Sequence, residues 1–190
     1  MKTVAIIGTV GLPACYGGFE SLVENLTLNA SDDIKYSVFC SSKSYKYRLS
    51  THNNAKLIYL PLKANGIQSV PYDILSLMKC CIQRPDVVVI LGVSGCVFLP
   101  IFRLISKSRV VTNIDGLEWK RAKWGKVARR FLKLSESLAV KYSDSIITDN
   151  QAITDYVKKE YSVSSSTIAY GGDHAIREGT SNMTGDYALA

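Results

Sequence analysis

The sequence predicts an α/β fold: a doubly wound, mainly parallel sheet of about seven strands. Three observations lead to this prediction. Short runs of Val, Ile and Leu alternate with longer segments of helical period along residues 3–170. The run at 86–91 shows no polar alternation, which is typical of a central parallel strand buried on both faces. Most strands are separated by a helix, as right-handed crossovers between parallel strands require.

The predicted strands are short runs rich in branched residues and bounded by turn residues. In chain order they are 4–8, 36–40, 57–60, 86–91, 109–114, 144–148 and 167–170. Gly8 ends the first strand, and Pro61 closes the third. Residues 41–54 are polar, and they predict a loop or a short exposed helix.

The predicted helices are 19–30, 70–83, 96–106, 125–142 and 151–161. Apolar spacing assigns an inward face to three of them. In the first helix, the residues expected on this face are Leu22, Val23, Leu26 and Leu28. In the second helix they are Ile74, Leu77, Met78 and Cys81, and in the fourth helix they are Val127, Phe131, Leu134 and Leu138. Pro85 ends the second helix, and 115–124 is irregular.

Length and composition indicate one globular domain with a sizeable core. The chain has 190 residues, 47% hydrophobic content and a net charge of +7, so an anionic partner is expected. The five cysteines are odd in number and lack CxxC spacing, which favours reduced thiols over disulfides or zinc. The uncharged stretch 87–102 is too short and too interrupted by Gly and Pro for a membrane span.

The first loop, between the strand 4–8 and the helix 19–30, has the glycine-rich form that presents backbone N–H groups to an anion. Its spacing, Gly8-x-x-Gly11-x-x-Ala14, also approaches that of dinucleotide-dependent oxidoreductases. Against that alternative, Pro13 lacks an N–H, and no acidic residue ends the strand 36–40 to hold a ribose. A tight turn without a ligand is a third interpretation. Glu20 favours the helix dipole in any case.

Residues 113–124 are the densest cluster of functional side-chain types. Asp115 follows a buried strand, so its carboxylate is expected in the crevice at the strand ends, where it suits a general base. The structural alternative is that Asp115 caps the following segment. Trp119 and Trp124 flank three basic residues, a combination that suits a sugar, a nucleotide or a membrane interface.

Seven basic residues and no acidic residue lie between Lys120 and Lys133. Lys126, Arg130 and Lys133 are expected on one side of the helix 125–142, away from its apolar stripe. This face is either simply solvated or attracted to anionic lipid. Nucleic acid is not an expected partner, because the chain has no helix-turn-helix, RRM or OB pattern.

Four separated segments resemble one protein family. They are IGTVGLPACYGGFE (7–20), NIDGLEWKRAKWGKVARRFLKLSE (113–136), AVKYSDSIITDNQAI (139–153) and IAYGGDHA (168–175). Together they look like the N-terminal domain of bacterial retaining GT-B glycosyltransferases, a group that includes rhamnosyltransferases of capsule and cell-wall polysaccharide synthesis. The resemblance implies a Rossmann-like domain at 1–173. It implies that 174–190 is a linker or the start of a missing C-terminal domain that binds the donor.

The resemblance also implies roles for individual residues. The first loop would face the donor diphosphate through Gly11, Gly17, Gly18, Phe19 and Glu20. Asp115 would lie near the reacting sugar as a base or a hydrogen-bond acceptor. The acceptor side would comprise Asn113, Glu118, Trp119, Lys120, Arg121, Asn150, Gly172, Asp173 and His174. Neither a metal nor a cofactor is expected in this architecture.

The implied partners are a nucleotide-sugar donor, with dTDP-rhamnose the first candidate, and a lipid-linked saccharide acceptor. The implied location is cytoplasmic, at the inner face of the plasma membrane, where Lys126, Arg130 and Lys133 would meet anionic lipid. Val10 stands where the family usually has a basic residue. An N-terminal half alone is expected to fold but to transfer little sugar. The alternatives are a stand-alone partner domain of a split transferase and, third, a dinucleotide-dependent oxidoreductase.

Overall fold

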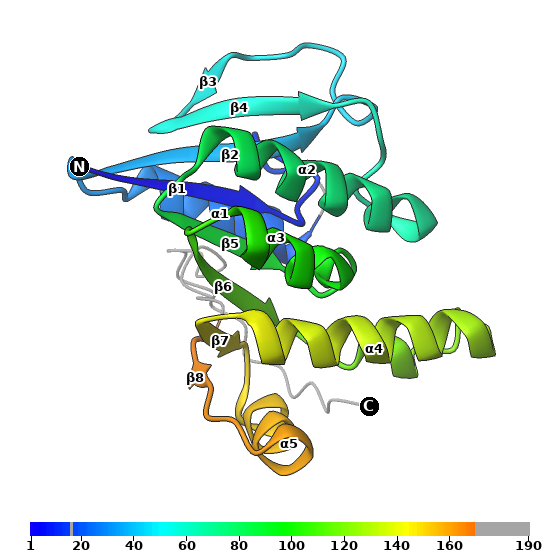
Figure 1. Ribbon diagram of the computed structural model, residues 1–190. Helices are drawn as coiled ribbons and strands as arrows, with labels where there is room; N and C mark the ends of the chain where they lie inside the picture. Colours follow the sequence, from blue (N-terminus) through cyan, green and yellow to red (C-terminus); the bar gives the residue numbers. More distant parts are fainter. Residues whose placement is uncertain (16, 170–190) are drawn as a thin grey trace, which may run out of the picture.

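The computed structural model describes residues 1–15 and 17–169, which form one sheet covered by helices (Figure 1). The strands are β1 (Lys2–Ile7), β2 (Ile34–Ser41), β3 (Thr51–His52), β4 (Ala55–Leu60), β5 (Val87–Leu91), β6 (Arg109–Ile114), β7 (Ser145–Thr148) and β8 (Ser166–Thr167). The sheet order is β3-β4-β2-β1-β5-β6-β7-β8, and every pairing except β3 with β4 is parallel. The predicted doubly wound α/β sheet is confirmed. β3 is an addition, because it lies within the polar segment that the sequence predicted as a loop or helix.

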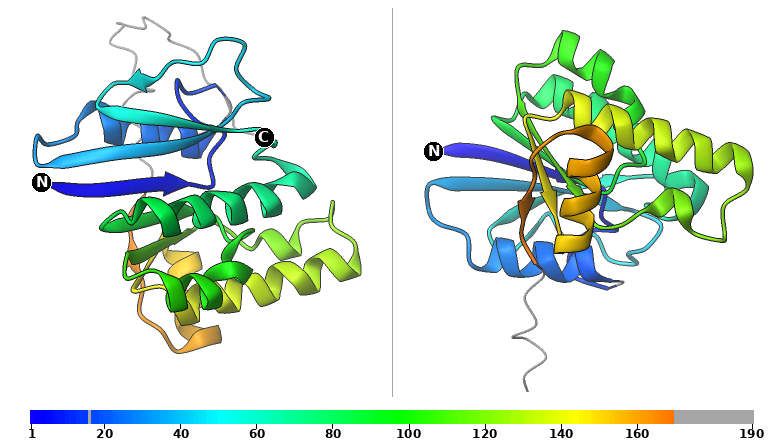
Figure 2. Two further views of the ribbon diagram at one scale, coloured as in Figure 1. Left: turned by 45° about the horizontal axis from the view of Figure 1, so that its top comes forward. Right: turned by 90° about the horizontal axis from the view of Figure 1, so that it is seen from below.

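The longer helices are α1 (Gly18–Leu28), α2 (Ser69–Gln83), α3 (Leu99–Ile105), α4 (Lys126–Tyr142) and α5 (Gln151–Tyr161). Short 3-10 helices η1 (Gly66–Gln68), η2 (Cys96–Phe98) and η3 (Glu118–Lys120) precede α2, α3 and α4. α2, α3 and α4 lie side by side on one face of the sheet, and α1 lies on the other (Figures 1 and 2). α5 packs against β7 and β8 at the edge.

The order of connections creates a crevice between β1 and β5. From β1 the chain passes through α1 to β2, on one side of β1. From β4 it passes through α2 to β5, on the other side of β1. β1 and β5 are parallel neighbours whose last paired residues are Ile7 and Ile90, so their carboxyl ends lie at the same edge. Such a reversal of winding direction opens a ligand-binding crevice beyond the strand ends.

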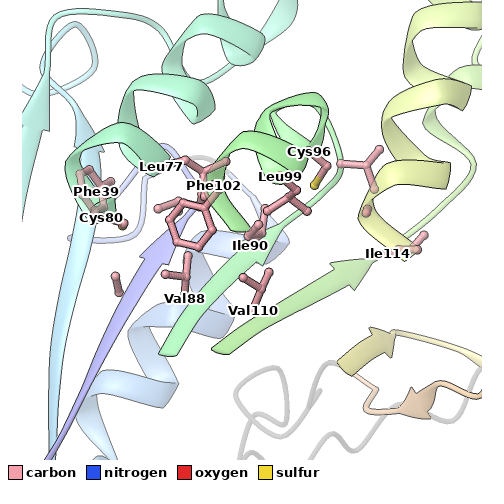
Figure 3. Packing of buried hydrophobic residues seen from close by; sticks show 14 of the residues in the cluster. Phe39, Leu77, Cys80, Val88, Ile90, Cys96, Leu99, Phe102, Val110 and Ile114 are labelled. Atoms are coloured by element: carbon pink, nitrogen blue, oxygen red, sulfur yellow. The ribbon is translucent and has the colours of Figure 1, made fainter. Parts of the chain in front are cut away.

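Two apolar clusters hold the layers together. The larger one lies between the sheet and the helices α2 to α5, where Leu77, Leu99 and Phe102 point toward Val88 and Ile90 (Figure 3). The smaller one lies between the sheet and α1, and it includes Ile6, Val38 and Val23 of α1. Because β1 and β5 contribute to both clusters, they are buried on both faces, as their unbroken runs of apolar residues predict.

The predicted inward faces of α1 and α4 are wrong, and that of α2 is wrong in part. In α2, Leu77 is buried as predicted, but Met78 is exposed. In α1, Leu26 and Leu28 are exposed, and the buried residues are Glu20, Val23 and Thr27. In α4, the predicted inward residues Val127 and Leu134 are exposed, while Phe131 and Leu138 are only partly buried. The buried residues of α4 are Leu132, Ser135, Glu136, Ala139 and Val140. The buried side of α4 thus combines apolar residues with hydrogen-bonded Ser135 and Glu136, while Val127 and Leu134 of the predicted stripe face outward.

Candidate functional site

A cavity of about 960 Å³ opens at the carboxyl ends of β1, β5 and β6. Its walls come from the first loop, the loops after β5 and β6, and the amino-terminal parts of α2 and α4. Of the predicted site residues, those that line the cavity are Gly17, Gly18, Phe19, Glu20, Asp115, Glu118, Arg121 and Lys126. The structure therefore brings the glycine pair and the Asp115 segment, far apart in sequence, to one site.

The start of the first loop is shaped by close backbone packing. Gly8 has φ +86°, and a Cβ at this position would lie 2.1 Å from the carbonyl oxygen of Leu91. Gly11 has φ +126°, and a Cβ there would lie 2.6 Å from the Cys40 Sγ. Only glycine fits both the left-handed backbone and the space. Gly11, predicted to face the donor, therefore packs against β2, while Gly17 and Gly18 border the cavity.

Glu20 holds the loop in this shape. The residue is buried, with 3% of its surface exposed. Oε1 accepts hydrogen bonds from the Thr9 hydroxyl (2.7 Å) and the Val10 N–H (2.6 Å), and Oε2 accepts one from the Gly17 N–H (2.8 Å). One buried carboxylate thus accepts hydrogen bonds from three donor groups of the loop, including the Val10 N–H.

Glu24, one helical turn after Glu20, joins the loop to the β3–β4 hairpin. It accepts a hydrogen bond from the Ala14 N–H (2.8 Å), pairs with His52 Nε2 (2.5 Å) and accepts another from Asn53 (2.9 Å). Burial opposes the effect, but these hydrogen bonds lower the pKa of Glu24. Protein carboxylates therefore occupy the loop N–H groups of Val10, Ala14 and Gly17, which an anion cradle would have offered to a phosphate.

Asp115 lies directly after β6, half-buried in the cavity wall. Burial raises its pKa, and the nearby carboxylates of Asp149 and Glu118 add to this effect, while Arg121 opposes it. A carboxylate with a raised pKa, facing a cavity, is a stronger proton acceptor than an ordinary aspartate.

Glu118 organises the rim of the cavity beside Asp115. Its carboxylate pairs with Arg121 Nε (2.7 Å) and Lys123 Nζ (2.9 Å), and it accepts a hydrogen bond from Trp124 Nε1 (3.0 Å). These three residues also line the cavity. The resemblance implied that Glu118 and Arg121 lie on the acceptor side; the structure shows that Glu118 fixes both Arg121 and Trp124.

Trp119 and Lys133 belong to a second cluster outside the cavity lining. Lys133 Nζ lies 4.9 Å from the Trp119 ring centre and pairs with Glu160 (2.8 Å). The buried Glu136 accepts hydrogen bonds from the hydroxyls of Tyr156 (2.5 Å) and Tyr161 (2.6 Å) and lies 3.3 Å from Lys133 Nζ. Desolvation opposes the shift, but hydrogen bonds to Glu160, Tyr156 and Tyr161 raise the pKa of Lys133. The cluster thus fastens η3 and α5 to α4, and its ion pairs compensate the charge of Lys133.

Replacing Lys133 with Met is expected to destabilise the fold by ~2 kcal/mol, because it leaves the buried Glu136 charge without its cation. The matched control is Lys126→Met, on the exposed first turn of the same helix. For the control we expect a change within ~0.5 kcal/mol. Urea unfolding of both variants measures the difference. Equal stabilities would show that the cluster does not fasten α4 to α5.

A buried polar pair that was not predicted from the sequence lies behind the cavity. Asp73 of α2 is 1% exposed, and the hydroxyl of Ser94, which lines the cavity, donates to its Oδ2. Burial raises the pKa of Asp73 to about 7. A Cβ on Gly95 would lie 2.3 Å from the Asp73 Cβ, so glycine lets α2 approach this loop. The sequence signal for this pair is the position of Asp73, a charged residue within a largely apolar helical segment.

The remaining predicted residues lie outside the cavity lining. Asn113 is buried in β6, and Asn150 caps α5 by accepting a hydrogen bond from the Ile153 N–H (3.0 Å). Lys120 is exposed, and its Nζ lies 5.2 Å from the centre of the Trp119 ring. Three predictions, Gly172, Asp173 and His174, lie outside the described residues, as does the predicted domain boundary at 173.

Within residues 1–15 and 17–169, no group of three His, Cys, Asp or Glu side chains is placed to hold a metal ion. Among the helices of the described part of the chain, none combines the length and apolar character that crossing a membrane requires.

A family model described as "Domain of unknown function (DUF1972)" matches residues 1–173. A search of curated proteins finds no match. Sucrose-phosphate synthase from Thermosynechococcus elongatus has a similar structure, with a TM-score of 0.68 and 13% identity, over 89% of this chain and 47% of that one. Arabidopsis thaliana UGT89C1 complexed with UDP gives a TM-score of 0.54 and 12% identity, over 86% of this chain and 49% of that one.

UDP-N-acetylglucosamine 2-epimerase from Rickettsia bellii gives a TM-score of 0.52 and 17% identity, over 84% of this chain and 42% of that one. At these identities the likeness shows the fold, and it confirms the predicted Rossmann-like α/β domain of GT-B type. The chain spans about half the length of these structural neighbours, between 42% and 49%.

Proposed function

The chain belongs to the DUF1972 family, and we propose that it is the acceptor-side domain of a glycosyltransferase. The observation that carries the proposal is the cavity at the β1–β5 switch point, with the Gly17-Gly18 pair in one wall and Asp115 in another. The shared fold with sucrose-phosphate synthase and UGT89C1 supports a role in glycosyl transfer.

In the proposed reaction, a hydroxyl of the acceptor attacks the anomeric carbon of a nucleotide-diphosphate sugar. The bond from that carbon to the diphosphate breaks, and the nucleoside diphosphate leaves with the electron pair. Asp115 accepts the hydrogen bond, and then the proton, of the attacking hydroxyl. Arg121 and Lys123, held by Glu118, give the cavity rim positive charge beside the diphosphate.

The proposed donor is a nucleoside-diphosphate sugar, with rhamnose as the leading sugar. UGT89C1 has been solved in complex with UDP-L-rhamnose, and that complex gives a TM-score of 0.51 and 11% identity with this chain. The backbone N–H groups of the first loop already donate hydrogen bonds to Glu20 and Glu24. We therefore assign most of the binding of the sugar-nucleotide diphosphate to a second domain.

The proposed acceptor is a saccharide on a lipid diphosphate, used in capsule or cell-wall polysaccharide synthesis at the inner face of the plasma membrane. Lys126 and Arg130 on the exposed first turns of α4 are the residues proposed to attract anionic lipid. Lys133 is placed differently from these two, since its charge is paired with Glu136 and Glu160.

The test is sugar transfer by the complete gene product. Radiolabelled dTDP-rhamnose, UDP-rhamnose and UDP-glucose are supplied with membrane lipid extract, and label in the lipid fraction is counted. Transfer from at least one donor is expected, with residues 1–190 alone transferring little. If the complete product neither transfers label from any of these donors nor binds them in calorimetry, the proposal is wrong.

A further inference from the structure

The outward faces of α2 and α3 are apolar. The exposed large apolar residues on these two neighbouring helices are Leu75, Met78, Ile82, Ile101, Leu104 and Ile105. Two of them are almost fully in solvent: Ile82 is 82% exposed and Leu104 is 87% exposed. Isolated exposed apolar residues are common, but a group of six on adjacent helices marks an interaction surface.

The outward stripe of α4 continues this surface. α4 lies beside α3 on the same face of the sheet, as both views of Figure 2 show. Val127 is 83% exposed and Leu134 is 55% exposed. We name the outward sides of α2, α3 and α4 together the outer helical surface.

The charges on the outer helical surface have one sign. α2, α3 and α4 contain two acidic residues, Asp73 and Glu136, and both are buried. The exposed charged residues of the three helices are Lys79, Lys126, Arg129, Arg130 and Lys141. Apolar side chains interspersed with basic ones, without exposed acids on these helices, match an anionic and partly apolar partner.

We propose that the outer helical surface docks on the surface of an anionic phospholipid bilayer. The apolar side chains of α2, α3 and α4 enter the boundary between headgroups and acyl chains, while Lys79, Arg130 and Lys141 contact lipid phosphates. A second copy of the chain would instead bring two surfaces of the same positive sign together, which is unfavourable.

Docking in this orientation also places the cavity beside the membrane. The amino-terminal part of α4 belongs to both features, since Val127 lies on the outer helical surface and also lines the cavity with Ala128 and Phe131. A saccharide attached to a lipid in the same bilayer would therefore reach the Asp115 side of the cavity without leaving the membrane surface. The docking extends the proposed attraction of Lys126 and Arg130 to anionic lipid, and the access of the saccharide to the cavity rests on the proposed function.

The test is co-sedimentation of residues 1–190 with vesicles of phosphatidylcholine, with and without phosphatidylglycerol. Binding is expected only when phosphatidylglycerol is present, and it is expected to weaken at high salt. Ile82→Ser combined with Leu104→Ser is expected to lower the partition coefficient roughly tenfold or more, because two exposed side chains no longer enter the lipid. Lys79→Glu with Lys141→Glu is expected to lower it by a similar factor.

The matched control is Leu28→Ser, an exposed leucine of α1 on the opposite face of the sheet. It is expected to leave partitioning unchanged, and thermal unfolding verifies that all variants are folded. Unchanged vesicle binding by the Ile82→Ser/Leu104→Ser variant, or an equal loss in Leu28→Ser, would overturn the proposal. So would a dimer in sedimentation velocity that this double variant dissociates, since the occupant would then be a second copy. These outcomes do not depend on sugar transfer.

Discussion

Replacing Asp115 with Asn in the complete gene product is expected to lower the rate of sugar transfer by ~100-fold or more, since general-base catalysis contributes a factor of that order. Asn keeps the size of the side chain in the cavity wall but does not accept a proton. The rate is measured with labelled donor and lipid acceptor under single-turnover conditions, and unfolding is followed in parallel.

The pH dependence of the transfer rate tests the role of Asp115 independently. Burial raises the pKa of Asp115, so its proton-accepting form is lost as the pH falls through that raised pKa. The transfer rate of the unmodified protein should therefore fall on this acidic limb, and the Asn variant should lack the limb. A raised carboxyl pKa also means that the charge on Asp115 costs stability as the pH rises above the unfolded-state pKa. The Asn variant should then be at least as stable at neutral pH.

The matched control for Asp115 is Asp149→Asn, a carboxylate near Asp115 that is outside the cavity lining. Its removal is expected to leave the rate within roughly threefold of the unmodified protein, because it acts only through the electrostatic field. Equal losses in the two variants, or full activity in Asp115→Asn, would remove Asp115 from the role of base.

Replacing Glu20 with Ala is expected to lower the free energy of unfolding by ~3 kcal/mol, because buried donors of the first loop lose their acceptor. Glu20→Gln keeps an oxygen for Thr9 and Val10 but turns an amide N–H toward the Gly17 N–H. Its expected loss is about half that of Ala. Urea unfolding measures both variants.

The exposed control on the same helix is Asn25→Ala, whose side-chain amide donates a hydrogen bond to the carbonyl of Ser21 within α1. A change within ~0.5 kcal/mol is expected there. If Glu20→Ala is no less stable than Asn25→Ala, then Glu20 does not brace the loop, and the loop N–H groups are available to a ligand after all.

Much of the fold follows from the sequence, because strand runs and helical period are local properties. The strand Arg109–Ile114 and the helix Gln151–Tyr161 have the predicted bounds. β3 was not predicted, because a strand of two residues is too short to show the alternation of apolar and polar residues. Its pairing with β4 depends on the hairpin rather than on its own composition.

The face that α4 buries did not follow from the sequence. Apolar period assumes that the apolar stripe turns inward, yet Ser135 and Ala139 are the residues small enough to approach the sheet and η2. Glu136 is tolerated inside because two tyrosines of α5 donate to it. Those partners are 20 and 25 positions away in the sequence, so only the tertiary structure shows them.

The candidate site could be predicted only in part, because some of its contacts depend on the tertiary structure. Parallel strands end at one edge, so residues just after strands, such as Asp115, were found from their position alone. Glu20 was expected to favour the helix dipole, and its three bonds to the loop depend on how the loop folds back. Trp119 looked equivalent to Trp124 in sequence, but the two rings point to different partners, Lys133 and Glu118.

The most direct measurement of the central claim is sugar transfer by complete gene products in which the cavity is filled. Gly116 lines the cavity, and a Cβ there would meet no atom within 4 Å. Gly116→Ala is therefore expected to keep the transfer rate, while Gly116→Trp is expected to abolish it without lowering the melting temperature. Full transfer by the folded Gly116→Trp variant would show that the reaction takes place elsewhere.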